Sequence, residues 1–181
     1  MNRRFATRDR IQGAAVSLFE EKGYAATAVA EVAALAGVTE MTVYRHFETK
    51  AALVIDDPFD PRIVAAVAAQ PTGEAPIVRV IEALSLAVRE LDEPDDALGV
   101  RRARIVAATP ELIGPIAENN LITQNLIAEQ LVADGADRVE AAVAAAAVLA
   151  AITAALTHSA SEETPLGVVV QRALDTLRAA S

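Results

Sequence analysis

The sequence contains no cysteine. Disulfide bonds and thiolate-bound zinc are therefore excluded, and a reducing compartment such as the cytoplasm is expected. Aromatic residues are scarce, with two Tyr and four Phe among 181 residues, and only eight residues are glycine. A chain that is 53% hydrophobic, rich in alanine and poor in aromatic residues favours helices over sheets. These absences predict an all-α protein.

Residues that could support catalysis are scarce as well. The chain has two His, of which His46 lies in a basic, aromatic segment and His158 lies more than a hundred residues away. It has no glycine-rich loop that could hold a phosphate. We therefore expect no enzyme activity, no cofactor and no metal site.

Charge is absent from residues 141–161, a run long enough to span a bilayer. This run is mostly alanine, and it lacks both a flanking Lys/Arg bias and interfacial aromatic residues. We therefore expect a buried helix with close neighbours instead of a membrane span. No apolar stretch follows the basic N-terminus, so that no signal peptide is expected.

Charged and aromatic residues divide the chain near residue 50. Residues 1–50 hold seven Lys/Arg against six Asp/Glu, whereas residues 51–181 hold nine against nineteen. Five of the six aromatic residues also lie in the first fifty. A nearly neutral domain with a basic arm, residues 1–50, is therefore expected to precede an acidic domain, residues 51–181.

Helical periodicity and Pro/Gly punctuation predict about ten helices and no strands. The expected ranges are about 7–22, 27–36, 40–47, 48 onward, 61–70, 76–92, 95–108, 110–133, 137–160 and 165–180. The short connections between them indicate packed, antiparallel neighbours.

The second and third expected helices have the spacing of a helix-turn-helix. Ala33 lets the two helices approach, Gly37 supplies a left-handed turn, and Val43 packs the second helix on the first. Thr39 is a suitable N-cap for the second helix. These positions predict a three-helix DNA-binding domain at the N-terminus.

At about 100° per residue, the helix over 40–47 places Val43 and Phe47 on its inner face. Its outward and flanking residues are Met41, Thr42, Tyr44, Arg45 and His46. A helix that enters a major groove needs outward residues at base edges and flanking residues at the phosphates. Each residue alone has a plain structural explanation, but together with the basic arm they favour DNA binding.

Residues 8–55 resemble the N-terminal domain of the tetracycline-repressor (TetR) family. The matching features are the Ala15/Leu18/Phe19 core, Gly23-Tyr24, Ala33, Gly37-Val38, Tyr44, His46-Phe47 and Lys50. The resemblance implies that Glu40, Met41 and Thr42 face bases, and that Tyr44, His46 and Lys50 bind phosphates. The expected DNA-binding residues are Thr27, Thr39, Glu40, Met41, Thr42, Tyr44, Arg45, His46 and Lys50.

Two positions depart from the family's pattern. Ala28 stands where a second threonine is usual, which puts one phosphate contact in doubt. Glu40-Met41 stands where small or amide residues are commoner. A glutamate accepts a hydrogen bond from cytosine N4 but repels phosphates.

The resemblance also implies a helical C-terminal domain that binds a small effector and dimerises through its last two helices, here residues 137–180. The stretches DDPFDP and RRARIVAATPEL are similar to a branch of actinobacterial regulators associated with acyl-CoA-like ligands. Phe59 is the one aromatic residue after residue 50, so that any pocket there must have aliphatic walls. Such walls suit a flexible acyl chain better than a flat aromatic drug.

Polar anchors for such a ligand are few. The ligand-binding candidates are Arg101, Arg104, Asn120, Gln124 and His158, with Arg102, Asn119 and Thr123 beside them. Each has a structural alternative: the arginines can pair with acids, the asparagines can be exposed, and the histidine can complement a helix C-terminus.

The sequence thus predicts a cytoplasmic, ligand-responsive repressor that binds a pseudo-palindromic operator as a homodimer. A small lipophilic effector, such as an acyl-CoA or a fatty acid, would release it from the DNA. The alternative is an effector-independent DNA-binding or architectural protein. The acidic C-terminal domain argues against that alternative, because non-specific DNA binders are usually basic throughout.

Overall fold

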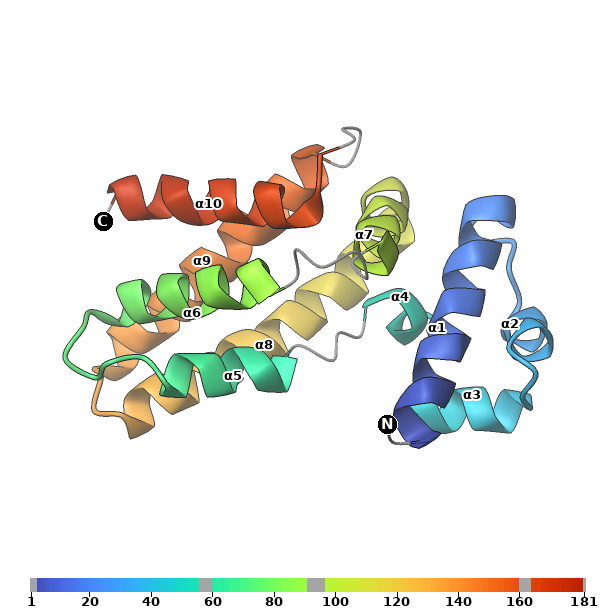
Figure 1. The fold of residues 1–181 in the computed structure, drawn as a ribbon, viewed down its shortest axis with the longest axis horizontal. Helices are drawn as coiled ribbons and strands as arrows, with labels where there is room; N and C mark the ends of the chain where they lie inside the picture. Colours follow the sequence, from blue (N-terminus) through green and yellow to red (C-terminus); the bar gives the residue numbers. More distant parts are fainter. Residues whose placement is uncertain (1–2, 56–59, 91–96, 160–163, 181) are drawn as a thin grey trace. The chain divides into compact units, whose positions relative to one another are not determined.

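The computed structural model describes residues 3–55, 60–90, 97–159 and 164–180, and over these residues it is helical without strands, as the sequence predicts (Figure 1). The elements are α1 (Arg3–Lys22), α2 (Val29–Leu35), α3 (Glu40–His46), α4 (Ala52–Ile55), α5 (Asp60–Ala68), α6 (Pro76–Glu90), α7 (Ala97–Ala108), the 3-10 helix η2 (Pro110–Leu112), α8 (Ile113–Ala133), α9 (Arg138–Ser159) and α10 (Leu166–Ala180). Phe59 and most of the DDPFDP stretch lie outside the described residues.

The helices form two compact units. Unit 1 comprises residues 1–56 and 98–115, and unit 2 comprises residues 57–97 and 116–181. The N-terminal helices are therefore grouped with α7 and η2, which follow much later in the chain. The domain boundary expected near residue 50 stays a prediction.

The core of unit 1 is built on α1. Buried apolar side chains from α1, α2, α3 and the turns beside them are Ile11, Ala15, Val16, Phe19, Val32, Ala33, Val43 and Phe47. Gly23 ends α1 with a φ of 85°, and Gly37 makes the turn between α2 and α3 with a φ of 65°. Both φ values lie in the left-handed region that glycine adopts without strain, as expected for these turns.

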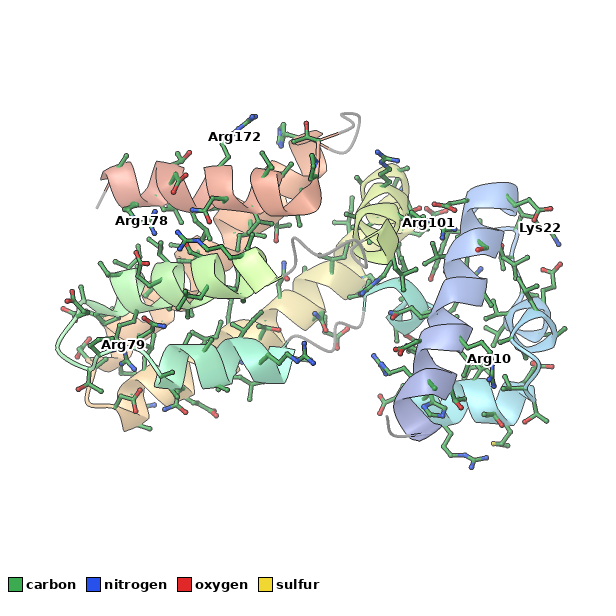
Figure 2. All side chains as sticks on the ribbon, viewed as in Figure 1. Arg10, Lys22, Arg79, Arg101, Arg172 and Arg178 are labelled. Carbon is green, nitrogen blue, oxygen red and sulfur yellow. The ribbon has the colours of Figure 1, made fainter. Side chains whose placement is uncertain are left out.

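Two adjacent arginines attach α7 to the N-terminal helices. The Arg101 guanidinium binds the Glu20 carboxylate, with Nε 2.9 Å from Oε1, and also donates to the Ser17 hydroxyl at 3.2 Å. Arg102 is buried and donates to the backbone oxygens of Val54, at 2.8 Å, and Ile55, at 3.0 Å. Figure 2 shows the Arg101 side chain between α7 and α1. The pairing of Arg101 with an acid is the structural alternative that the sequence left open.

The hydrophobic core of unit 2 consists of aliphatic side chains, and Arg79, Ser85 and Thr123 are the buried polar residues among the described part of this unit. In it α6, α9 and α10 contact one another and α5 packs on α6. The buried residues include Val67, Val80, Ile81, Leu84, Ile127, Leu131, Ala144, Val148 and Leu174. No aromatic ring takes part in this core among the described residues.

Helix α9 is apolar on all sides but buried on one. Ala141, Ala145 and Val148 face the core, whereas Val143 is 60% exposed. Only 28% of the stretch Arg138–His158 is buried within the chain. By length and composition alone this stretch could cross a membrane, a criterion that core helices of water-soluble proteins also meet. The expectation of a buried helix therefore holds for one face.

Candidate nucleic-acid interface

The outward face of α3 is open to solvent. Met41 is 71% exposed and Tyr44 is 48% exposed, and the side chains of Glu40 and Arg45 are exposed beside them. On the opposite face, Val43 and the following Phe47 are almost completely buried. The rotation predicted from the sequence is confirmed, and α3 presents a mixed acidic, apolar, aromatic and basic surface.

The first turn of α3 is fixed by two threonines. The Thr39 hydroxyl accepts a hydrogen bond from the backbone N–H of Thr42 at 3.2 Å, which confirms Thr39 as the N-cap. The hydroxyl groups of Thr39 and Thr42 lie 2.9 Å apart and hydrogen-bond to each other. These hydrogen bonds hold the first turn of the helix, from which Glu40 and Met41 project.

Two arginines of α1 hold the other ends of the helix-turn-helix. Arg10 donates from Nε to the backbone oxygen of Ala36 at 2.8 Å, just after α2. Arg8 donates to the backbone oxygen of His46 at 3.1 Å, and its guanidinium lies 4.4 Å from the centroid of the Phe47 ring. Cations stabilise helix C-termini, where backbone oxygens lack helical partners.

Thr27 and Lys50, both expected to contact DNA, turn toward the protein. Thr27 is 2% exposed, and its hydroxyl lies 2.9 Å from the backbone oxygen of Gly23. The Lys50 ammonium donates to the backbone oxygens of Tyr24 and Ala25, at 2.5 and 3.4 Å. The two side chains brace the same turn between α1 and α2, and their direct contact with DNA stays a prediction.

Ala28, which stands where the family usually has a threonine, begins α2 without a side-chain hydroxyl. Ala28 is the N-cap of α2 but has no side chain to cap the helix. Instead the Glu31 carboxylate accepts a hydrogen bond from the Ala28 N–H at 2.9 Å and pairs with Lys22 at 2.6 Å. The Ala28 N–H and then Lys22 hold the pKa of the Glu31 carboxyl below its usual value. Glu31 thus satisfies the backbone N–H of Ala28, which is the glutamate half of a capping box.

The candidate ligand-binding residues fall in both units. Arg101 and Arg104 belong to unit 1, and Asn120, Gln124 and His158 belong to unit 2. Asn120 donates to the Thr153 hydroxyl at 3.0 Å and so joins α8 to α9. The Nδ1 atom of His158 lies 2.8 Å from the backbone oxygen of Ala154 in its own helix. Their roles toward a ligand stay predictions.

Each unit carries an open groove. In unit 1, a groove of about 650 Å³ lies between the end of α1, the α1–α2 turn and the α7–η2 segment, and Arg104 lines it. In unit 2, a groove of about 830 Å³ lies between α6 and α10 and is lined largely by polar side chains, three arginines among them. Neither of these two grooves is lined by Asn120, Gln124 or His158.

Residues 11–56, which include α2, α3 and all the expected DNA-binding residues, match the family described as bacterial regulatory proteins, tetR family. Over 118 residues the chain is 34% identical to the HTH-type transcriptional regulator TcmR of Streptomyces glaucescens. That alignment covers 59% of this chain and 50% of TcmR, so that it spans half the length of that relative.

Solved structures are similar in fold over nearly all of this chain. One is the complex of SmeT, from Stenotrophomonas maltophilia, with triclosan, at a TM-score of 0.62 and 22% identity, covering 97% of this chain and 91% of that one. Another is FadR from Bacillus subtilis with stearoyl-CoA, at a TM-score of 0.58 and 19% identity, covering 93% and 96%.

Proposed function

This chain is a member of the TetR family of bacterial regulatory proteins, and we propose that it is a ligand-responsive transcriptional repressor that binds a pseudo-palindromic operator as a homodimer. The observation that carries this proposal is the division of α3 into a buried face, formed with Val43, and an exposed face that bears Met41 and Tyr44. In each protomer α3 enters one major groove. The expected location of such a regulator is the cytoplasm.

The exposed residues of α3 divide by chemistry. Glu40 accepts hydrogen bonds, as cytosine N4 requires, and the Met41 side chain offers an apolar surface to a thymine methyl group. Tyr44, Arg45 and His46 provide donors for phosphate oxygens on the flanks of the helix. Thr39 and Thr42 hold the first turn of α3 and bring Glu40 and Met41 to the bases.

The proposed homodimer interface is the outer face of α9 with the neighbouring face of α10. Val139, Val143 and Val168 are exposed large apolar residues on these helices, and exposed alanines continue the face along α9. Small side chains let helix backbones approach closely, so that a second copy can cover this face. A second copy covers it better than a membrane would, because a family member must reach DNA in solution.

The proposed effector is a small lipophilic molecule with an aliphatic chain, such as an acyl-CoA or a fatty acid. The hydrophobic core of unit 2 is aliphatic over the described residues, and each methylene that a ligand buries against such side chains contributes about 0.8 kcal/mol. FadR binds stearoyl-CoA and SmeT binds triclosan, so that relatives of this fold accept both kinds of ligand. The absence of rings from the described part of unit 2 favours the acyl chain.

The experiment selects a duplex from a random library with the full-length protein and measures its binding by fluorescence anisotropy. Acyl-CoAs of increasing chain length are then added, with triclosan as the aromatic comparison. Release of DNA that becomes more efficient with chain length supports the proposal. Release by triclosan alone would contradict the effector class, and no selected duplex at all would contradict the DNA-binding function.

The second candidate function is an effector-independent DNA-binding or architectural protein. The contacts of α7 within unit 1 support this second candidate. Arg101 is paired with Glu20 and Arg102 donates to backbone oxygens, so that neither cation is needed for a ligand. In that case the selected duplex binds tightly and no added ligand changes the affinity.

A further inference from the structure

We propose that the groove between α6 and α10 binds a phosphorylated small molecule of the sugar-phosphate class, whose negative groups pair with Arg89 and Arg172. The groove has a volume of about 830 Å³, and all its described lining residues belong to unit 2. None of the residues expected to bind a lipophilic effector lines it. Binding at this groove does not depend on the proposed DNA-binding function.

The first support is the distribution of charge in unit 2. Residues 57–97 and 116–181 hold seventeen Asp/Glu and six Lys/Arg. Three of those six, Arg89, Arg172 and Arg178, line the groove. An acidic unit that places half of its cations around one hollow creates a site of opposite sign to its surroundings, and such a site attracts anions.

Arg178 is already neutralised. Its guanidinium reaches from α10 toward α6, where it lies 2.7 Å from the Glu82 carboxylate, and it also lies 2.7 Å from the Asp175 carboxylate (Figure 2). Gln171 donates to the same oxygen of Asp175 at 2.9 Å. Asp175 is the single acid among the described lining residues, and two donors already bind it. It therefore leaves the other two arginines of the groove without compensation.

Arg89 and Arg172 are exposed on different helices, near the end of α6 and in the middle of α10. Over the part of the chain that the structure describes, neither guanidinium pairs with a carboxylate. A guanidinium presents its N–H donors in a planar fork that matches the oxygens of a phosphate group. A phosphate ester carries nearly two negative charges and three acceptor oxygens, so that it compensates two arginines better than a single carboxylate does.

The rest of the lining indicates what the phosphate is attached to. No aromatic ring is present among the described lining residues, so that a nucleobase would find no stacking partner there. The side-chain oxygen of Gln171 is buried and turns no acceptor toward an anion. A small, hydroxyl-bearing skeleton that stays partly hydrated in an open groove fits these surroundings better than a base does.

The test measures binding to the full-length protein by isothermal titration calorimetry at constant ionic strength. The ligands are inorganic phosphate, fructose 1,6-bisphosphate and ADP, with succinate as the dicarboxylate comparison. Arg89→Gln and Arg172→Gln each remove one guanidinium from the groove. Arg138→Gln is the matched control, because Arg138 is exposed in the same unit but does not line the groove. The melting temperature of each protein is recorded with and without ligand.

We expect fructose 1,6-bisphosphate to bind more tightly than inorganic phosphate, with a Kd of about 1 mM or lower, because its two phosphate groups can serve both arginines. Each groove variant should weaken this binding by roughly tenfold or more, since it loses charge-assisted hydrogen bonds. Neither variant should lower the melting temperature of the ligand-free protein, because both side chains are exposed and without a described acid partner. Arg138→Gln should bind like the wild type.

Several results would overturn the proposal. Equal weakening in Arg138→Gln would indicate general attraction to positive charge, and no binding of any phosphate compound would remove the site. Succinate that binds as tightly as the bisphosphate would contradict a phosphate site, and tighter binding of ADP would contradict the sugar-phosphate class. Val168, at the edge of the groove, also belongs to the face proposed for the homodimer. Groove variants that sediment as monomers but bind phosphate normally would therefore identify an acidic side chain of a second copy as the occupant.

Discussion

Arg79 and Asp134, which lie 55 residues apart, form an ion pair of 2.5 Å that joins the start of α6 to the end of α8. The Arg79 side chain is 2% exposed. It also donates to the backbone oxygen of Val67, in the last turn of α5, at 3.1 Å. Gln130 donates to the second oxygen of Asp134 at 3.0 Å. One buried guanidinium therefore connects three helices of unit 2.

Replacing Asp134, the acidic partner of this ion pair, should lower the stability of the protein more than replacing Arg79. Asp134→Asn leaves the Arg79 charge buried without a counterion, and we expect the melting temperature to fall by roughly 5–10 °C. Arg79→Met removes the charge and keeps most of the apolar volume, and it also removes an Nε–H that has no acceptor among the described residues. Its effect should be clearly smaller. Thermal denaturation followed by circular dichroism gives both values, and equal losses would contradict this explanation.

The same contacts predict how stability depends on pH. The hydrogen bond from Arg79, followed by that from Gln130, lowers the pKa of Asp134 below its ordinary value of 3.8. A carboxyl whose pKa is lower in the folded state stabilises the fold above its unfolded pKa, and this contribution is lost as the pH falls toward the folded pKa. The free energy of unfolding should therefore decrease on acidification below about pH 4. Urea denaturation at several pH values should show a shallower decrease for Asp134→Asn than for the wild type.

The two arginines that attach α7 should differ in importance. Arg101 and Glu20 are both about 40% exposed, so that solvent screens their pair, and Arg101→Met should cost no more than about 1 kcal/mol. Arg102 is buried, and Arg102→Met leaves the backbone oxygens of Val54 and Ile55 without their donor, at an expected cost of about 2–3 kcal/mol. Chemical denaturation of the two variants measures both costs. A larger loss for Arg101→Met would show that the buried contacts are not the stronger attachment.

Tyr44 and Met41 should affect DNA binding in different ways. Tyr44→Ala removes a proposed phosphate contact, and we expect a similar loss, of roughly five- to tenfold, on the selected duplex and on a scrambled one. Met41→Ala removes a proposed base contact, so that the loss should appear mainly on the selected duplex. Both side chains are exposed, and neither variant should change the melting temperature. A scrambled duplex that still binds Tyr44→Ala normally would show that Tyr44 does not contact the backbone.

Val143 tests the proposed homodimer. Val143→Glu places a charge on the exposed face of α9 without touching the core, and the protein should sediment as a monomer at micromolar concentration. Leu35→Glu is the matched control, because Leu35 is 58% exposed on α2, away from the proposed interface. It should sediment like the wild type. A wild-type protein that is itself monomeric would contradict the interface.

Sequence patterns predicted the local features of this structure, whereas they named no partner for several long side chains that bind residues far away in the chain. The position of Gly37, the cap at Thr39 and the burial of Val43 follow from neighbours within a few residues, and all three are confirmed. The direction of a long cationic side chain does not follow from its neighbours, because its flexible stem reaches partners that only folding brings near. The hydrogen bond from the Lys50 ammonium to the backbone oxygen of Tyr24 is one such partner, and the contact of Lys50 with a phosphate stays a prediction.

The grouping of α7 with the N-terminal helices shows the same limit. Composition and charge change near residue 50, which places residues 98–115 with the C-terminal part of the chain. The structure groups these residues with the N-terminal helices instead. The link consists of side chains that meet across 81 residues for Arg101 and 48 residues for Arg102. Arg101 and Arg102, in an acidic part of the sequence, indicate that these side chains pair with acids or backbone oxygens, but the sequence does not show which residues those are.

Because unit 1 is assembled from two separate parts of the chain, the unit that carries the helix-turn-helix and the unit proposed to bind an effector cannot be exchanged by a single crossover. In a chimera joined near residue 56, α7 and the N-terminal helices would come from different proteins. Arg102 would then face backbone oxygens other than those of Val54 and Ile55. Recombination that preserves regulation must transplant residues 98–115 together with the N-terminal segment. Evolution of the proposed ligand response is correspondingly constrained, because substitutions in residues 98–115 are also substitutions in the unit that carries the helix-turn-helix.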